Sequence, residues 1–414
     1  MDIKDFTEYP DVFHLIKDLK DRGIHEKAFS DVIDENGFQY VELVQEGGGV
    51  LGVALIGYTY VLEQMGLRFL GLAGTSAGSI NTILLASLGK INEPKSEKLI
   101  TLLADKNLFD FGDGGPRVKS FFNAIFRNKE KLKIIWNGLK ITNRIFKYLG
   151  LNPGINFLDW LTEVIGSEGI GSTRDLLDRI SRLPSGLKIR TGIDRSISGL
   201  VPRLAIITAD VTTETKVEFP KMGILYWNNP EEVNPAVYVR ASMSIPFFFE
   251  PLKVTNIPSG PDAMNKWNEL ASYIGEIPYE VRFVDGGIMS NFPIDIFHKK
   301  HVVPRLPTFG AKLGIDRNKL NQIKSPFSLF GAIFNSVRHL HDYDFILRNK
   351  DYKMLVKQID IGDHNWLNFN LSDEAKKDLF YRGAKAAAEF LKDFYWEKYK
   401  EIRKNIASQI YPVK

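Results

Sequence analysis

Between residues 40 and 89 the apolar positions follow two patterns in turn. Short continuous apolar runs at 40–44 and 69–73 are typical of buried strands. Longer stretches at 53–65 and 79–88 repeat apolar residues at helical spacing. Glycines stand between each run and the stretch that follows it. The pattern predicts strand, glycine-rich turn, helix, strand, sharp turn and helix.

The rest of the chain continues this alternation. Strand patterns occur at 201–208, 216–219, 283–285, 307–314 and 354–361. Helical patterns occur at 237–245, 327–347 and 372–405, the last as one long helix or a helix pair. Residues 253–279, with two prolines and a glycine close together, are expected to form an exposed excursion. Strands alternating with helices favour an α/β sheet flanked by helices.

The sharp turn at Gly74-Thr75-Ser76-Ala77-Gly78 carries the first candidate chemistry. A serine between a strand and a helix in this spacing is forced into a strained conformation, and flanking side chains would collide, so both flanks are glycine. Its hydroxyl then lies beside a helix N-terminus with free N–H groups. The earlier turn at 47–49 can add bare backbone N–H groups, which stabilise the oxyanion of a tetrahedral intermediate.

Composition narrows the function classes. The chain has 414 residues, 44% hydrophobic and 25% charged, as in an ordinary globular protein with a sizeable core. It has no cysteine, which excludes disulfides, cysteine–zinc sites and a catalytic thiol. A net charge of +4 gives no indication of a nucleic-acid partner. We expect no signal peptide and no transmembrane helix, because the N-terminus lacks an apolar core and no run of about 18 apolar residues occurs.

Residues 117–150 form a basic and aromatic stretch in which Glu130 is the only acid. Such a segment can lie on an anionic lipid surface. The alternative is a solvated cap helix that packs its apolar face on the core, and the two interpretations are compatible. We therefore expect a cytoplasmic protein that attaches reversibly to membranes. The candidate membrane contacts are Lys129, Lys131, Lys133, Trp136 and Lys140.

Asp285 ends a strand pattern and precedes Gly286 and Gly287. An aspartate in that position can be a turn former whose carboxylate bonds its own backbone. It can also be a catalytic base at the end of the sheet. The residue alone favours the turn former.

Three separated stretches together resemble the patatin-like phospholipases, a family of lipid acyl hydrolases. Residues 47–52 look like the family's oxyanion loop, 74–78 like its nucleophile elbow, and 285–287 like its aspartate motif. The resemblance runs from about residue 41 to about residue 391 and is weakest across 90–200. It implies an α/β three-layer fold, with a mixed, mostly parallel sheet flanked by helices and a helical cap insertion. We expect an appendage at 1–38, the hydrolase domain at 39–405 with its cap at 90–200, and a tail at 406–414.

The resemblance also implies a mechanism, a Ser76–Asp285 dyad without histidine that cleaves fatty-acyl esters through an acyl-enzyme. It implies a phospholipid or other acyl-lipid substrate and no metal or other cofactor. Leu51 departs from the family, which usually has Arg or Lys there, and this leaves the anchoring of the loop in question. The implied oxyanion hole comprises Gly47, Gly48, Gly49, Val50 and Ala77. The implied turn supports are Gly74, Gly78, Gly286 and Gly287.

Three alternatives remain open. A Ser-His-Asp hydrolase could use one of the later histidines, which are His298, His301, His339, His341 and His364. A catalytically silent or partner-activated membrane-binding module would make 117–150 the functional part. An acyltransferase would share the acyl-enzyme and differ only in the acceptor. The sequence does not indicate the lipid headgroup, the ester position, an activator or the oligomeric state.

Overall fold

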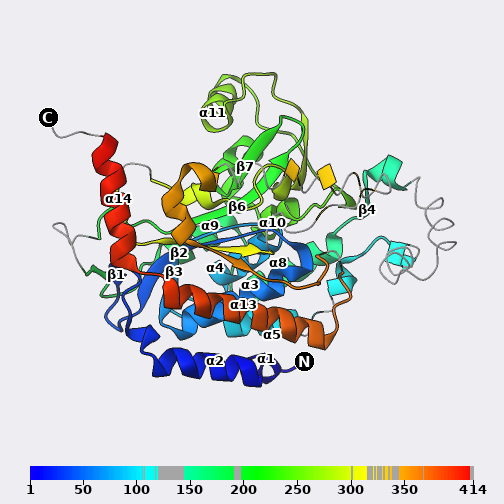
Figure 1. Cartoon of the computed structure of the whole chain (residues 1–414). Coiled ribbons are helices and arrows are strands. Elements are labelled where there is room, and N and C mark those ends of the chain that lie inside the picture. The colour runs from blue at the N-terminus through cyan, green and yellow to red at the C-terminus, as the bar shows by residue number, and fades with distance from the viewer. Residues whose placement is uncertain are drawn as a thin grey trace.

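The structure is a computed structural model, shown in Figure 1. It describes residues 1–104, 106, 108–116, 118–119, 144–190, 197–299, 302–314, 345–366 and 368–410, with a few single residues between 320 and 337.

Ten strands of the described residues form one sheet at the centre of the fold, and seven of them lie in the order β12-β11-β2-β3-β6-β10-β9. The five strands from β12 to β6 are parallel, and β10 and β9 run antiparallel to their neighbours. The bounds are β2 Gln39–Gln45, β3 Leu67–Thr75, β6 Arg203–Asp210, β9 Leu252–Thr255, β10 Glu280–Asp285, β11 Thr308–Leu313 and β12 Val356–Ile359. The predicted mixed, mostly parallel sheet is confirmed.

Three further strands complete the sheet at its margins. β1 (Val32–Ile33) pairs with β2 and with β5 (Lys188–Ile189), and β7 (Thr215–Phe219) pairs with β6. A separate two-stranded sheet joins β4 (Gly150–Asn152) to β8 (Phe247–Phe249).

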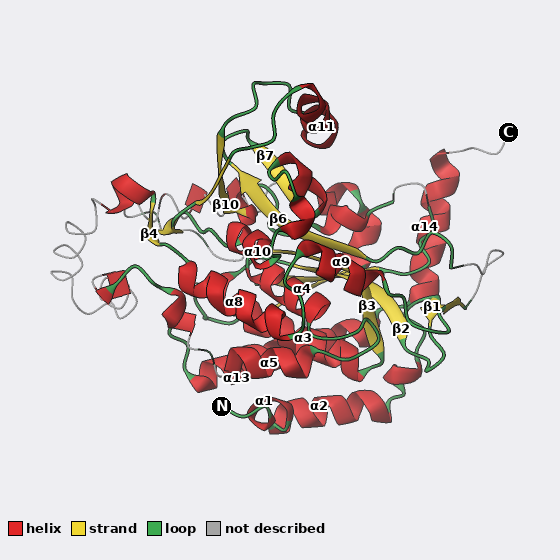
Figure 2. Cartoon of the chain, turned by 180° about the vertical axis from the view of Figure 1, so that it is seen from behind, coloured by secondary structure: helices red, strands yellow, loops and turns green. Residues whose placement is uncertain are grey.

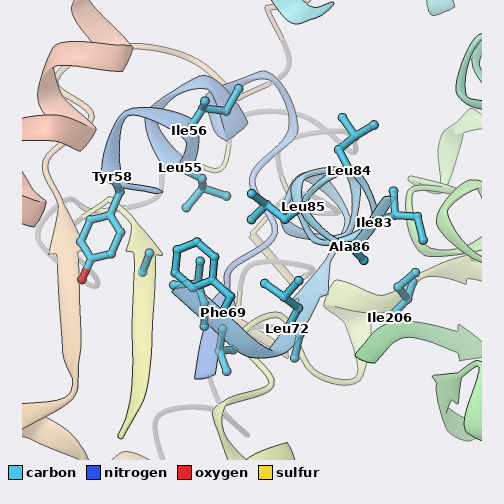
Figure 3. Close-up of a cluster of buried hydrophobic side chains, with 14 of the residues drawn as sticks. Leu55, Ile56, Tyr58, Phe69, Leu72, Ile83, Leu84, Leu85, Ala86 and Ile206 are labelled. Carbon is cyan, nitrogen blue, oxygen red and sulfur yellow. The ribbon is translucent and has the colours of Figure 1, made fainter. Parts of the chain in front are cut away.

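Helices cover one face of the sheet. α3 (Gly52–Gln64) and α4 (Ala77–Ser87) follow the first two strands of the elbow unit, and α13 (Asp373–Asp393) packs along α3. α3 is buried almost all round, and close backbone contact with α13 occurs where Gly57 and Gly383 lack side chains. Figure 3 shows Leu55 of α3, Leu85 of α4 and Phe69 of β3 in one apolar cluster.

The segment that follows β10 packs on the opposite face. Phe297 lies where Gly71 leaves room on β3, and Phe292 lies where Gly310 leaves room on β11. On the first face, the ring of Phe309 meets Phe390 of α13 at 4.7 Å. The sheet therefore has an apolar layer on each side, as the three-layer prediction requires.

The N-terminal residues are more integrated than an appendage. α1 (Lys4–Thr7) and α2 (Pro10–Asp21) pack on α13, with the rings of Phe6 and Phe380 5.5 Å apart. β1 joins the central sheet. At the other end, α13 is followed by α14 (Trp396–Ile410), so the tail predicted from residue 406 begins inside a helix.

The stretch 253–279 is not wholly an exposed excursion. It contains β9 and α11 (Pro261–Ala271), and Trp267 of α11 is buried. Pro261 occupies the first helical turn, where proline loses no hydrogen bond, so the proline that suggested a loop is a helix start.

The region 90–200 is partly described. α5 (Ser96–Ala104), α8 (Ile155–Ser167) and α9 (Thr173–Ser181) bury apolar residues in the main core, and α10 (Ala236–Ser242) packs against α8. β4 projects at the end of the molecule away from α14, as Figures 1 and 2 both show. The five predicted membrane contacts lie outside the described residues. In the part of the chain that is described, no helix has both the length and the apolar character needed to cross a bilayer.

Candidate active site

Ser76 lies in the turn between β3 and α4, in a strained backbone conformation. Its φ is 50° and its ψ is −118°, values that a side chain rarely tolerates. The elbow predicted from the glycine spacing is therefore present in the backbone. Ser76 is buried, and it immediately precedes the N-terminus of the 11-residue α4.

The flanking glycines are required by contact with backbone atoms. A Cβ on Gly74 would overlap the carbonyl of Gly78, and a Cβ on Gly78 would overlap the carbonyl of Gln45. A Cβ on Gly286 would overlap the carbonyl of Ile207. These three glycines let β2, β3, β6 and the turn after β10 approach one another.

Asp285 reaches the same place from an antiparallel strand. β6 lies between β3 and β10, with Thr75 opposite Ile207 and Asp285 opposite Thr208. Because Ile207 and Thr208 are consecutive, the ends of β3 and β10 are level across β6. The Asp285 carboxylate also accepts a hydrogen bond from Gly287 N–H at 2.7 Å, so it is a turn former as well.

Ser76 and Asp285 line one small pocket, with about 170 Å³ of empty space. Gly47, Gly48 and Gly49 line it too. Asn291 and Trp366 complete its lining. The structure thus brings the nucleophile elbow, the aspartate motif and the glycine loop together.

The glycine loop offers fewer free N–H groups than the sequence indicated. Gly47 N–H donates to the carbonyl of Asn291 at 3.0 Å, and Val50 N–H donates to the carbonyl of Trp366 at 3.1 Å. Neither group is available to an oxyanion in this arrangement. Among the described residues, the N–H groups of Gly48, Gly49 and Ala77 donate to no acceptor. The candidate oxyanion hole is therefore these three groups.

A buried polar network anchors the loop. Glu46, directly before it, forms an ion pair with Lys312 at 3.5 Å, and both side chains are at most 3% exposed. Glu46 also accepts from Leu313 N–H at 2.6 Å and from the Asn291 amide at 3.0 Å. Leu51 is buried in the apolar core. The anchoring that Leu51 left in question thus comes from Lys312 on β11 and from the Trp366 carbonyl.

Two serines hold the elbow and the aspartate in place. Ser242 Oγ accepts from Ser76 N–H at 2.9 Å and donates to the carbonyl of Ile207 at 2.5 Å. The carbonyl of Ser244 accepts from Asp285 N–H at 2.8 Å. Both serines belong to α10 or the turn after it, so this short helix fixes the distance between the two candidate catalytic residues.

Arg240 ties α10 to the projecting part of the molecule. Its buried guanidinium donates to Ser244 Oγ at 2.6 Å and to the carbonyls of Glu250 and Pro153. Burial lowers its pKa to about 10, so it stays charged at neutral pH. These contacts fix the turn that bonds Asp285. Sequence reasoning assigned no role to Arg240, Ser242, Asn291, Lys312 or Trp366.

No histidine stands in the described lining of the pocket. His364 Nε2 lies 2.7 Å from the carboxylate of Asp378 on α13. The ring of His298 packs against the rings of Phe345 and Tyr352. The other candidates, His301, His339 and His341, lie outside the described residues. Across the described ranges there is no group of three or more His, Asp or Glu arranged to hold a metal.

A family model described as patatin-like phospholipase matches residues 43–298, which is more than half of the chain and includes all three motifs of the pocket. The chain belongs to the patatin-like phospholipase family. Membership places it among lipid hydrolases, which act on lipid substrates.

Individual relatives are more distant. The chain is 28% identical over 355 residues to the uncharacterized protein YqhO of Bacillus subtilis (strain 168), across 86% of this chain and 99% of that protein. It is similar to the crystal structure of VipD from Legionella pneumophila, with a TM-score of 0.41 and 15% identity, covering 88% of this chain and 70% of that one. It is also similar to the complex of SpcU with ExoU from Pseudomonas aeruginosa, with a TM-score of 0.33 and 17% identity. The match covers 90% of this chain and 59% of that one.

Proposed function

We propose that this patatin-like protein is a phospholipase A or lysophospholipase that cleaves fatty-acyl esters with a Ser76–Asp285 dyad. The observation that carries the proposal is the shared pocket, in which a strained serine and an aspartate meet a loop of bare glycines. The absence of histidine from the described lining favours a two-residue mechanism over a Ser-His-Asp triad.

The geometry supports the following sequence of steps. Ser76 Oγ attacks the ester carbonyl while Asp285 takes its proton, and the N–H groups of Gly48, Gly49 and Ala77 hold the oxyanion. Collapse of the tetrahedral intermediate expels the alcohol, which takes the proton back from Asp285. Asp285 then activates a water molecule, which hydrolyses the acyl-enzyme and releases the fatty acid.

The testing experiment measures fatty-acid release from mixed phospholipid vesicles by the wild type, Ser76→Ala and Asp285→Asn. We expect both variants to lose at least about 10³-fold in kcat/KM while unfolding at the wild-type temperature. If Ser76→Ala loses activity and Asp285→Asn keeps it, a histidine would become the candidate for the general base. Release that survives in both variants would refute the dyad, and no release from folded wild type would favour the silent or partner-activated module.

We also propose reversible attachment to anionic membranes through the end of the molecule that carries β4 and β8. Phe146 is 79% exposed, and Phe247 is exposed on β8 opposite Gly150. Lys147 lies beside Tyr148 in this surface, 4.9 Å from its ring. Exposed aromatic residues with adjacent cations suit an anionic lipid interface. Phe247 is three residues after Ser244, so attachment here would bring the lipid toward the pocket.

Vesicle co-sedimentation tests this attachment. We expect Phe146→Ser/Phe247→Ser to bind vesicles containing anionic lipid at least about fivefold more weakly than the wild type. Ile274 is 84% exposed elsewhere on the surface, so Ile274→Ser is the matched control and should bind normally. Reversal of Lys129, Lys131 and Lys133 to Glu tests the sequence-based contacts, and unchanged binding at low salt would contradict them.

A further inference from the structure

A second cavity lies at the opposite end of the parallel strands from the candidate active site. It has about 860 Å³ of empty space, a figure that includes its open mouth. Its lining comes from the residues before β6, β11 and β12, from Glu42 within β2, and from α14. We call it the basal cavity. Figures 1 and 2 show α14 at the end of the molecule away from β4.

The wall of the basal cavity is held by its own contacts. Arg403 of α14 is buried and forms an ion pair with Asp351 at 2.7 Å. Its guanidinium also donates to the carbonyl of Val302 at 2.9 Å and to that of Lys299. Lys299 and Val302 are thereby tied to α14 by a residue whose charge is already neutralised. A wall of this kind needs no ligand to form, which lowers the cost of binding.

The remaining charge of the lining is mainly positive. Lys299 is exposed at the mouth, and Arg305 is half-buried and donates to the carbonyl of Ser198 at 3.0 Å. Glu42 is the carboxyl that opposes them in the cavity lining. Lys299 and Arg305 thus bring positive charge into the lining, which attracts an anion.

The inner part of the lining is polar and has hydroxyl groups. Thr308 donates its hydroxyl to one carboxyl oxygen of Glu42. The buried side chains of Tyr352 and Tyr399 interact electrostatically with Glu42. Burial raises the pKa of Glu42 to about 7, against the opposing effects of Thr308, Arg203 and Lys299. The groups in this inner part of the lining can both donate hydrogen bonds to the hydroxyls of a ligand and accept hydrogen bonds from them.

We propose that the basal cavity binds a small phosphorylated polyol, with its phosphate between Lys299 and Arg305 at the mouth. The polyol hydroxyls bond to Glu42, Tyr352 and Tyr399 inside. A fatty acid fits less well, because its alkyl chain would have to bury these polar groups without partners. The polyol phosphate has two sources, a free metabolite or the headgroup of a lipid, and the shared chemistry is the phosphate ester with adjacent hydroxyls.

The site is separate from the catalytic pocket and does not depend on the proposed hydrolysis. β11 begins at Thr308 in the basal cavity and ends at Leu313, which contacts Gly48 of the glycine loop. Five residue steps place the two sites roughly 16 Å apart along one strand.

Isothermal titration calorimetry of the full chain tests the site with inositol 1-phosphate, inorganic phosphate and unphosphorylated inositol. We expect saturable binding of inositol 1-phosphate, weaker binding of inorganic phosphate, and none of inositol. Lys299→Gln/Arg305→Gln should weaken inositol 1-phosphate binding by at least about tenfold, because two charge-assisted contacts are lost. Glu42→Gln should weaken inositol 1-phosphate but leave inorganic phosphate unchanged, because it touches only the polyol.

Lys266 on α11 is an exposed lysine outside the cavity, so Lys266→Gln is the matched control and should bind like the wild type. If the double variant unfolds, the single variant Lys299→Gln tests the loss of the phosphate contact in its place. The second arm uses Ser76→Ala protein with phosphatidylinositol or phosphatidylcholine vesicles. Binding to phosphatidylinositol alone that needs Lys299 identifies the headgroup as the source. No saturable binding in either arm, or binding unchanged by the Lys299 variants, would overturn the proposal.

Discussion

The two ends of the parallel strands are lined by different kinds of residue. At the carboxyl ends of β2 and β3, bare glycines let backbone groups meet in a small pocket around Ser76. At the amino ends of β11 and β12, long charged and aromatic side chains surround the larger basal cavity. The catalytic end therefore depends on the absence of side chains, and the basal end on their charge. We therefore expect substitutions at the catalytic end to act through steric overlap and substitutions at the basal end to act through changes of charge.

The largest effect on stability and activity taken together is expected from a single methyl group in the elbow. Gly78→Ala would drive a Cβ into the carbonyl of Gln45, so we expect about 3 kcal/mol of lost stability and at least about 100-fold lower kcat/KM. Gly166 near the end of α8 has open space around its Cβ position, and Gly166→Ala should be neutral or stabilising. Denaturant unfolding and ester hydrolysis provide the measurements. Equal stability and activity in Gly78→Ala and Gly166→Ala would contradict the claim that the catalytic end depends on the absence of side chains.

The next effect concerns the buried charge that anchors the glycine loop. Lys312→Met keeps the volume but leaves the buried Glu46 carboxyl without its cationic partner, and we expect a loss of about 3–5 kcal/mol. Lys357→Met removes a partly exposed pair with Glu389 and should cost no more than about 1 kcal/mol. Glu46→Gln/Lys312→Met should recover part of the loss in a double-mutant cycle. A loss for Lys312→Met as small as that for Lys357→Met would contradict this anchoring.

The pH dependence of unfolding tests the buried charge at the basal end. The pKa of Glu42 is raised by burial from the ordinary 4.5 to about 7, so the folded protein holds a proton that the unfolded chain releases. Stability from this group is complete below about pH 4.5 and is lost as the pH rises through about 7, by about 3 kcal/mol in all. Glu42→Gln should remove that part of the pH dependence of unfolding. Identical profiles for wild type and variant would show that burial does not act on Glu42 in this way.

The smallest effect is expected from the hydroxyl that supports Ser76. Ser242→Ala removes the acceptor of Ser76 N–H and the donor to Ile207, at about 1 kcal/mol of stability and about tenfold in kcat. KM should change little, because Ser242 does not line the pocket. Ser181 makes a local bond at the exposed end of α9, and Ser181→Ala should leave both quantities unchanged. A change in KM alone would point to substrate binding instead of positioning.

The sequence predicted the catalytic end well because its rules are local. Strand, turn and helix follow one another within 50 residues, and the glycine spacing alone indicated the steric demand at Ser76. The lengths of β2, α3, β3 and α4 agree with that prediction within a few residues. Asp285 needed the family resemblance, since its immediate sequence also suits an ordinary turn, and its carboxylate does bond the turn.

The supports of the site were not predictable because they come from distant segments. Ser242 is 166 positions from Ser76, and Lys312 belongs to a strand that joins β2 only in the folded sheet. The engaged N–H groups of Gly47 and Val50 were equally hidden, since their acceptors are Asn291 and Trp366. The basal cavity draws single residues from several segments, so no local pattern marked it.

The measurement that tests the central claim most directly is the mass of the protein after treatment with a fluorophosphonate. Attack by a serine oxygen on phosphorus forms a stable phosphonyl ester and expels fluoride, so an activated serine is marked permanently. We predict one adduct, located on Ser76, that forms at least about 100-fold more slowly in Asp285→Asn and at the normal rate in Lys299→Gln. An adduct on another residue, or labelling of Ser76 that is indifferent to Asp285, would contradict the dyad.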